Sequence, residues 1–120
     1  MQIGSTYVTT CPVIDVREYI DAQGRSPYAR WFDRLPARAA AKVSVAVTRM
    51  SHGNFANVKG VGAGVLERVI DWGPGYRIYF GRDGDELIVL LGGGSKKGQQ
   101  SDIERAKECW KDYQGRKARE

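Results

Sequence analysis

The alternation of apolar and polar residues predicts a chain that begins with one strand and two helices. Residues 13–20 alternate aliphatic and polar side chains in the manner of a half-buried strand. Ser26-Pro27 then offers a helix N-cap and a proline at the first helical position, and apolar residues recur at helical spacing as far as Leu35. A second, basic helix is predicted over residues 36–52. Two consecutive helices of this kind form an αα-hairpin that can cover one face of a sheet.

The pattern changes to strands after a glycine-rich connection at residues 60–64. Turn residues separate short apolar runs, which is typical of an antiparallel meander. The predicted strands cover residues 65–70, 76–80 and 86–91. A last helix is predicted to start at Ser101, whose side chain would form a capping box with Glu104.

The predicted order of elements is β-α-α-β-β-β-α. This is an α+β fold in which a small antiparallel sheet carries an N-terminal helical hairpin and a C-terminal helix. The 120 residues are expected to form a single domain over residues 1–120. Within it, residues 1–12 are expected to be a loose N-terminal extension and residues 115–120 a frayed, charged tail.

Composition narrows the choice of partners. The formal net charge of +5 favours an anionic partner, either nucleic acid or an acidic protein segment. Cys11 and Cys109 lie too far apart for a metal-binding pair, and with one histidine the sequence predicts neither a metal site nor a cofactor. No segment has the length and apolar character of a membrane span or the pattern of a signal peptide, so a cytoplasmic protein is expected.

A cation inside a strand is the most informative feature for function. Arg77 lies within the strand predicted at residues 76–80, and alternation puts it on the same face as Tyr79, away from the predicted core. One interpretation is a surface ion pair with Asp71 or Glu67 across the hairpin. The other is that Arg77 binds phosphate.

Two lysines after the last predicted strand favour the second interpretation. Lys96 and Lys97 follow a glycine run at residues 92–94, which would let backbone and ammonium groups approach a phosphate, although the spacing of a P-loop is absent. A solvated loop is the alternative. In a meander the end of the last strand can lie near the middle strand, which would bring these lysines toward Arg77.

Two other basic residues and the single histidine complete the candidates. Lys59 and Arg68 add positive charge to the same region. Arg68 alternates with residues predicted to be core, so either its strand has a bulge or its side chain points elsewhere. His52 could serve as a general base, but its place at the end of a predicted helix favours a capping role.

Several short segments, in order and spacing, resemble a known family. They are residues 30–35 (Arg-Trp-Phe-Asp-Arg-Leu), 53–59, 64–67, 73–80 (Gly-Pro-Gly-Tyr-Arg-Ile-Tyr-Phe), 93–96 (Gly-Gly-Ser-Lys), 99 and 102–107. Together they make the span from about residue 16 to residue 113 similar to the phage-derived Gp49-like, HigB-type toxins of the RelE/ParE superfamily, often called addiction-module killer proteins.

The resemblance implies the toxin of a type II toxin–antitoxin module. Its partners would be a helix-turn-helix, HigA-like antitoxin, in complexes that can reach higher order, and the ribosome with its mRNA. The implied activity is metal-independent, ribosome-dependent cleavage of mRNA. The implied catalytic residues are Arg77, Lys96 and Arg68, and the implied RNA-binding residues are Lys59, Tyr79 and Lys97.

The chain departs from the family pattern at two places, and these keep other functions open. Val69 stands where the family often has a cation before the isoleucine of the strand, and Ile103 stands near the position of an acid–base tyrosine in RelE-type enzymes, while Tyr113 comes much later. Without an obvious acid–base residue, the alternative is a ParE-like DNA gyrase inhibitor with no nuclease activity. A third interpretation is a member that only binds its antitoxin.

Overall fold

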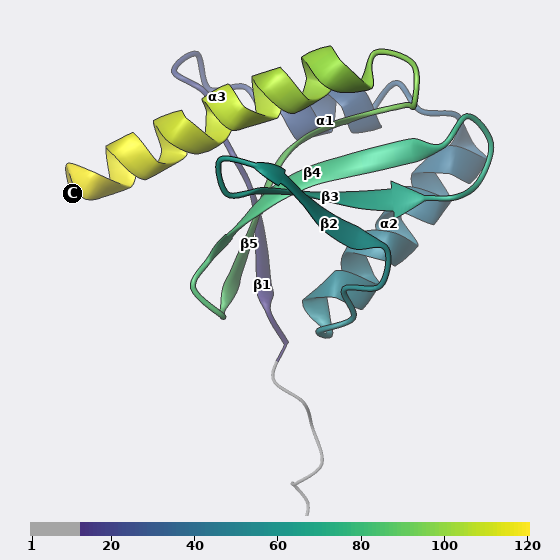
Figure 1. Ribbon diagram of the computed structural model, residues 1–120, viewed down its shortest axis with the longest axis horizontal. Coiled ribbons are helices and arrows are strands. Elements are labelled where there is room, and N and C mark those ends of the chain that lie inside the picture. Colours follow the sequence, from purple (N-terminus) through teal and green to yellow (C-terminus); the bar gives the residue numbers. More distant parts are fainter. Residues whose placement is uncertain (1–12) are drawn as a thin grey trace, which may run out of the picture.

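The computed structural model describes residues 13–120, which form a five-stranded sheet with helices on both faces (Figure 1). The elements are β1 (Asp15–Glu18), α1 (Pro27–Phe32), α2 (Ala37–Ser51), β2 (Val58–Gly62), β3 (Val65–Ile70), β4 (Tyr76–Asp83), β5 (Leu87–Gly94) and α3 (Gln99–Ala118). The predicted α+β class is confirmed, and two consecutive helices follow the first strand as predicted. Ser26 caps α1 as predicted, because its Oγ accepts a hydrogen bond of 2.9 Å from the Ala29 N–H. The extension predicted at residues 1–12, with Cys11, lies outside the described residues.

The sheet is mixed: it is mostly antiparallel, as expected, but it contains one parallel pair that the sequence did not predict. The strand order is β1-β5-β4-β3-β2, and β1 pairs with β5 in parallel while the other neighbours are antiparallel. A parallel pair needs a long connection between its strands. Here that connection runs through the helical hairpin and the three strands that follow it.

The glycine-rich connection contains a strand that the sequence did not predict. β2 pairs with β3 at the edge of the sheet, with an irregular register between Gly60 and Gly62. Glycine weakens a strand and often marks a bulge, and Gly62 has a φ of 105° that other residues rarely adopt. Backbone pairing with β3 therefore forms this strand in spite of its composition.

The last helix is longer than predicted at both ends. α3 begins at Gln99 after Gly98, whose backbone is left-handed, so the capping box predicted at Ser101 and Glu104 is wrong. The Ser101 hydroxyl instead donates to the Gly98 carbonyl at 3.2 Å. At the other end, α3 continues through the tail that was predicted to fray from residue 115, and Lys117 binds Asp83 at 2.6 Å.

Each face of the sheet has its own apolar core. The face toward α1 and α2 buries Val43, Met50, Ile78, Phe80 and Ile88. The face toward α3 buries Val65, Tyr79, Val89, Leu91 and Trp110. The sequence placed this face away from the core, and this is wrong for Tyr79 because α3 covers it.

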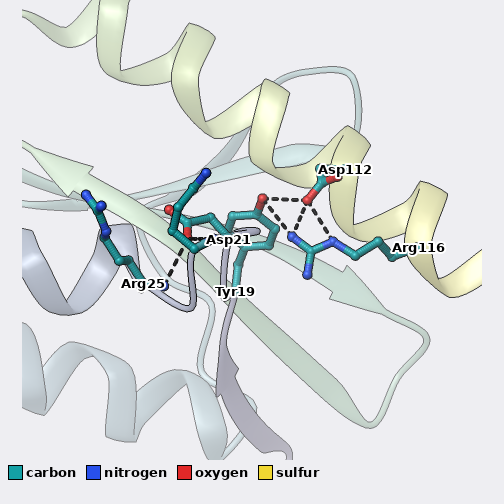
Figure 2. A network of polar contacts seen from close by, with 6 residues as sticks. Tyr19, Asp21, Arg25, Asp112 and Arg116 are labelled. Carbon is teal, nitrogen blue, oxygen red and sulfur yellow. Dashed lines mark hydrogen bonds and ion pairs between the residues drawn. The ribbon is translucent and has the colours of Figure 1, made fainter.

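Polar contacts attach α3 to the rest of the fold near its C-terminal end. The Tyr19 hydroxyl donates to Asp112 at 2.6 Å, and Arg116 contacts both residues from the next turn of α3 (Figure 2). Burial, followed by the Asp112 carboxylate, raises the pKa of Tyr19 to about 12, so the hydroxyl keeps its proton as a donor. This network joins α3 to the segment that follows β1.

None of the helices within residues 13–120 combines the length and apolar character that crossing a membrane requires.

The contact between α3 and the β4–β5 turn predicts a pH dependence of stability. Hydrogen bonds from Lys117 and then Tyr113 hold the pKa of Asp83 below its usual value. The native state therefore binds this proton less readily than the unfolded chain, so the contact stabilises the fold above about pH 4 and is lost as the pH falls. We expect the melting temperature, followed by circular dichroism from about pH 6 to about pH 2, to fall less steeply in Asp83→Asn than in the wild type.

The matched control is Asp85→Asn, because Asp85 is an exposed aspartate beside the same turn. It should keep the wild-type slope. Equal slopes for Asp83→Asn and the wild type would contradict this interpretation.

Candidate functional site

A buried carboxylate lies at the centre of the basic residues on the α3 side of the sheet. The side chain of Glu67, in β3, has no exposed surface. Its Oε2 accepts a hydrogen bond of 2.8 Å from the side-chain amide of Gln99, the first residue of α3. Lys59 Nζ lies 3.7 Å from its Oε1, and Arg77 Nε lies 3.6 Å from its Oε2. Burying a carboxylate is costly unless it is paired, and these neighbours supply the pairing.

The strand register explains why these residues meet. Lys59, Glu67, Tyr79 and Gly92 stand opposite one another across β2, β3, β4 and β5, so their side-chain positions share the α3 face. Arg77 lies two residues before Tyr79 and shares its face. The ion pair between Arg77 and Glu67 that the sequence offered as an alternative is therefore present, but it is a buried pair rather than a surface one.

Arg77 and Lys96 meet around the turn between β3 and β4. Arg77 Nη1 donates to the Gly75 carbonyl at 2.7 Å, and the side chain keeps 12% of its surface exposed. The backbone N–H of Lys96 donates to the Pro74 carbonyl at 3.4 Å. A Cβ atom placed on Gly75 would lie 3.4 Å from Arg77 Nη1 and 3.7 Å from Lys96 Cβ. The Arg77 guanidinium and the Cβ of Lys96 therefore both lie beside Gly75, in the region where the meander was expected to bring the two residues.

Tyr79 is not placed to bind nucleic acid, which corrects the sequence interpretation. Its side chain is fully buried in the core beneath α3. Burial, followed by the nearby Glu67 carboxylate, raises the pKa of its hydroxyl above the usual value. Tyr79 therefore belongs to the apolar core under α3 and has no exposed surface that a ligand could contact.

Arg68 lies on the opposite face of the sheet from Arg77, so the three predicted catalytic cations do not form one group. It stands opposite Val58 and Ile78, on the side that α2 covers. Only 8% of the residue is exposed, and its Nη1 donates to the Val69 carbonyl at 2.7 Å. The register of β3 and β4 is regular here, so Arg68 simply points to the face that alternation gives it.

The glycine run before the lysines is strand backbone rather than an open loop, which corrects the prediction of a phosphate-binding turn. Gly93 and Gly94 belong to β5. A Cβ atom on Gly93 would overlap the ring of Trp31 from α1, and one on Gly94 would overlap the carboxylate of Asp102 from α3. These glycines therefore let the two helices approach the sheet closely from its two faces.

Lys97 lines a cleft beside the end of β5. The cleft, of about 760 Å³, lies between α1 and α3, and its cationic lining residues are Arg30, Arg34, Lys97 and Arg105. Arg105 is paired with Asp102 at 2.8 Å. Glu108 lines the cleft as well, so four cations face two carboxylates there.

His52 has the capping role that its position predicted. It is the C-cap residue of α2, and its Nδ1 lies 2.8 Å from the Thr48 carbonyl. Its ring nitrogen is therefore used within its own helix rather than in the group around Glu67.

No family model matches the chain. An uncharacterized protein of Haemophilus influenzae is 41% identical over 78 residues, which span 64% of this chain and 79% of that protein. The chain belongs to the family of that protein. Because the relative is uncharacterized, family membership brings no activity with it, and function is argued from the geometry of the site.

The close packing around Gly93 predicts a loss of stability when a side chain is added. In Gly93→Ala the new methyl group would displace Trp31, so we expect the free energy of unfolding to fall by about 1–3 kcal/mol. Urea denaturation measures this. Gly60→Ala is the matched control, because nothing lies within 4 Å of its Cβ position, and it should change stability by less than about 1 kcal/mol. Equal stability for the two variants would show that the glycine run is not a packing feature.

The central carboxylate predicts a second stability difference. Glu67→Gln removes the charge that Arg77 and Lys59 face, and breaking a buried pair should lower the free energy of unfolding by about 3 kcal/mol. Glu104→Gln removes an exposed glutamate that contacts Lys107 at 3.8 Å, and should cost less than about 1 kcal/mol. Urea denaturation of both variants measures these differences. A Glu67→Gln protein as stable as the wild type would contradict the ion pairing of Glu67 with Arg77 and Lys59.

Proposed function

We propose that this protein is the toxin of a type II toxin–antitoxin module and that it cleaves mRNA on the ribosome without a metal ion. The observation that carries the proposal is the meeting of Arg77 and Lys96 around Gly75, with Arg77 oriented by the buried Glu67. A fixed guanidinium beside a flexible ammonium is suited to the negative charge of a phosphate that is changing its bonds.

The reaction requires positioning and charge rather than a cofactor. The 2′-oxygen of RNA attacks the adjacent phosphorus and forms a bond to it, while the bond from phosphorus to the 5′-oxygen breaks. The products are a cyclic phosphate and a 5′-hydroxyl, with the proton of the 2′-hydroxyl lost to water and one gained by the leaving oxygen. Arg77 and Lys96 would stabilise the extra charge on the phosphorane, and the ribosome would hold the message in line for attack.

The surroundings of this pair support binding of an RNA backbone. Lys59, with 63% of its side chain exposed, lies on the other side of Glu67. Lys97 lines the cleft between α1 and α3. Cations spread along a surface in this way bind successive phosphates without reading bases.

The fold supports the toxin assignment at a coarser level. A helical hairpin on one face of the sheet and a C-terminal helix on the other are the arrangement that the RelE/ParE resemblance implies. The proposed partner is a HigA-like, helix-turn-helix antitoxin, which would hold the toxin inactive in the cytoplasm.

One observation favours a second candidate, a gyrase inhibitor without nuclease activity. Glu67 and Tyr79, on the same face as Arg77, are fully buried and cannot reach a substrate proton. The carboxylate of Asp102, which lies over Gly94 opposite Arg77, is already paired with Arg105. In a gyrase inhibitor Arg77 and Lys96 would be architectural.

Cell-free translation with purified protein tests the nuclease. We expect primer extension to show cuts at ribosome-occupied codons, and Arg77→Ala to slow cutting by about 100-fold or more, because it removes an oriented cation from the transition state. The matched control is Arg25→Ala, which removes an equal charge from an exposed turn and should cut at the wild-type rate.

Intact message with the wild-type protein would overturn the nuclease. Inhibition of gyrase supercoiling by that same protein would then establish the second candidate.

A further inference from the structure

A second basic cleft lies on the other face of the sheet, between α2 and β3. Its volume is about 800 Å³. The cationic residues that line it are Arg38, Lys42, Arg49 and Arg68, and Asp71 is the single acidic residue among its described lining residues. The first three lie along one side of α2 at helical spacing, and Arg68 comes from the strand beneath them.

Arg68 is a buried cation without an anion. The residue is 8% exposed, its Nε has no hydrogen-bond partner, and its Nη1 is bound only to a backbone carbonyl. Within residues 13–120 no carboxylate lies at ion-pair distance from it. Burial and then the nearby Arg49 lower the pKa of its guanidinium, which shows that its surroundings disfavour the charge. An anion brought by a ligand would relieve this cost.

The cleft also offers apolar surface in line with the cations. Val45 is 47% exposed, and Ala41 lies beside it on α2. Trp72 also lines the cleft, and Tyr76 stacks on its ring with centroids 6.3 Å apart while Lys42 Nζ lies 5.8 Å from its centroid. A nucleic acid base would therefore compete with Tyr76 and Lys42 for this ring, whereas an aliphatic side chain would find Val45 exposed.

We propose that this cleft binds an acidic, partly apolar segment of a partner protein, with one carboxylate paired to Arg68 and an apolar side chain packed on Val45. Charge complementarity carries the choice of occupant: four cations face one acid, and one of those cations is already desolvated. The cleft lies on the opposite face of the sheet from Glu67 and Arg77, so a partner bound here would leave the proposed RNA surface open.

The test is titration of the full chain into a fluorescently labelled synthetic helical peptide that carries glutamates and leucines on one side, followed by anisotropy. We expect saturable binding that weakens at least about tenfold in Arg68→Met, because the variant removes the buried partner of a carboxylate. Arg49→Gln, at an exposed position in the same cleft, should weaken binding as well. The matched control is Arg119→Gln, an exposed arginine at the end of α3, which should bind as the wild type does.

A melting curve separates binding from folding. Removing an unpaired buried charge should leave Arg68→Met folded, with a melting temperature equal to or a few degrees above that of the wild type. If Arg68→Met does not fold, the peptide affinity of Arg49→Gln tests the proposal instead, and an affinity equal to that of the wild type would contradict it.

Three results would overturn the proposal. They are no binding of the peptide, equal weakening by Arg119→Gln, and preferential binding of a single-stranded RNA oligonucleotide that is lost in Arg68→Met. The last would assign the cleft to nucleic acid. None of them depends on whether the protein cuts mRNA.

Discussion

The α3 side of the molecule depends on the pairing of one buried carboxylate. Glu67 has no exposed surface, so its charge must be balanced within the protein. Its partners come from three other elements: Lys59 from β2, Arg77 from β4 and Gln99 from the start of α3. The same interaction therefore joins the edge of the sheet to its centre and to the first residue of the last helix, and it holds an arginine whose side chain keeps 12% of its surface exposed. A cation that is already ordered loses less conformational freedom when it binds phosphate. The ion pair that stabilises the buried Glu67 would therefore also favour phosphate binding by Arg77.

The sequence predicted the helices better than the sheet, for physical reasons. A proline after Ser26 and the helical spacing of apolar residues are local features, and they located α1 and α2 within a few residues. β2 was missed because Gly60 and Gly62 disfavour a strand and only pairing with β3 forms it. The parallel pairing of β1 with β5 was missed because alternation within a strand says nothing about its neighbour. Alternation also separated the two faces of β4 correctly, but it could not show that α3 buries the second face over Tyr79.

The candidate site was predictable in part. The meander topology predicted that Arg77 and Lys96 lie near the same turn, and both lie beside Gly75. Strand alternation predicted that Arg68 shares a face with core residues, and in the structure its side chain lies on that face, under α2. Glu67 was visible in the sequence as a possible ion-pair partner and as part of the family resemblance, but nothing local indicates that a strand glutamate will be buried. Gln99 entered only as one position of that resemblance, with no role attached. The two faces differ in one respect: Arg77 has a carboxylate at ion-pair distance, while within residues 13–120 Arg68 has none.

The most direct test of this account is heteronuclear NMR of the arginine Nε–H groups in the free protein. Because the Arg77 Nε is buried 3.6 Å from Glu67 Oε2, its N–H should give a separate resonance that exchanges slowly with water. In Glu67→Gln, which removes the charge that holds the arginine in this position, the Nε–H should exchange as fast as that of the exposed Arg25. An Arg77 Nε–H that already exchanges like that of Arg25 in the wild-type protein would contradict the claim that the buried carboxylate organises the site.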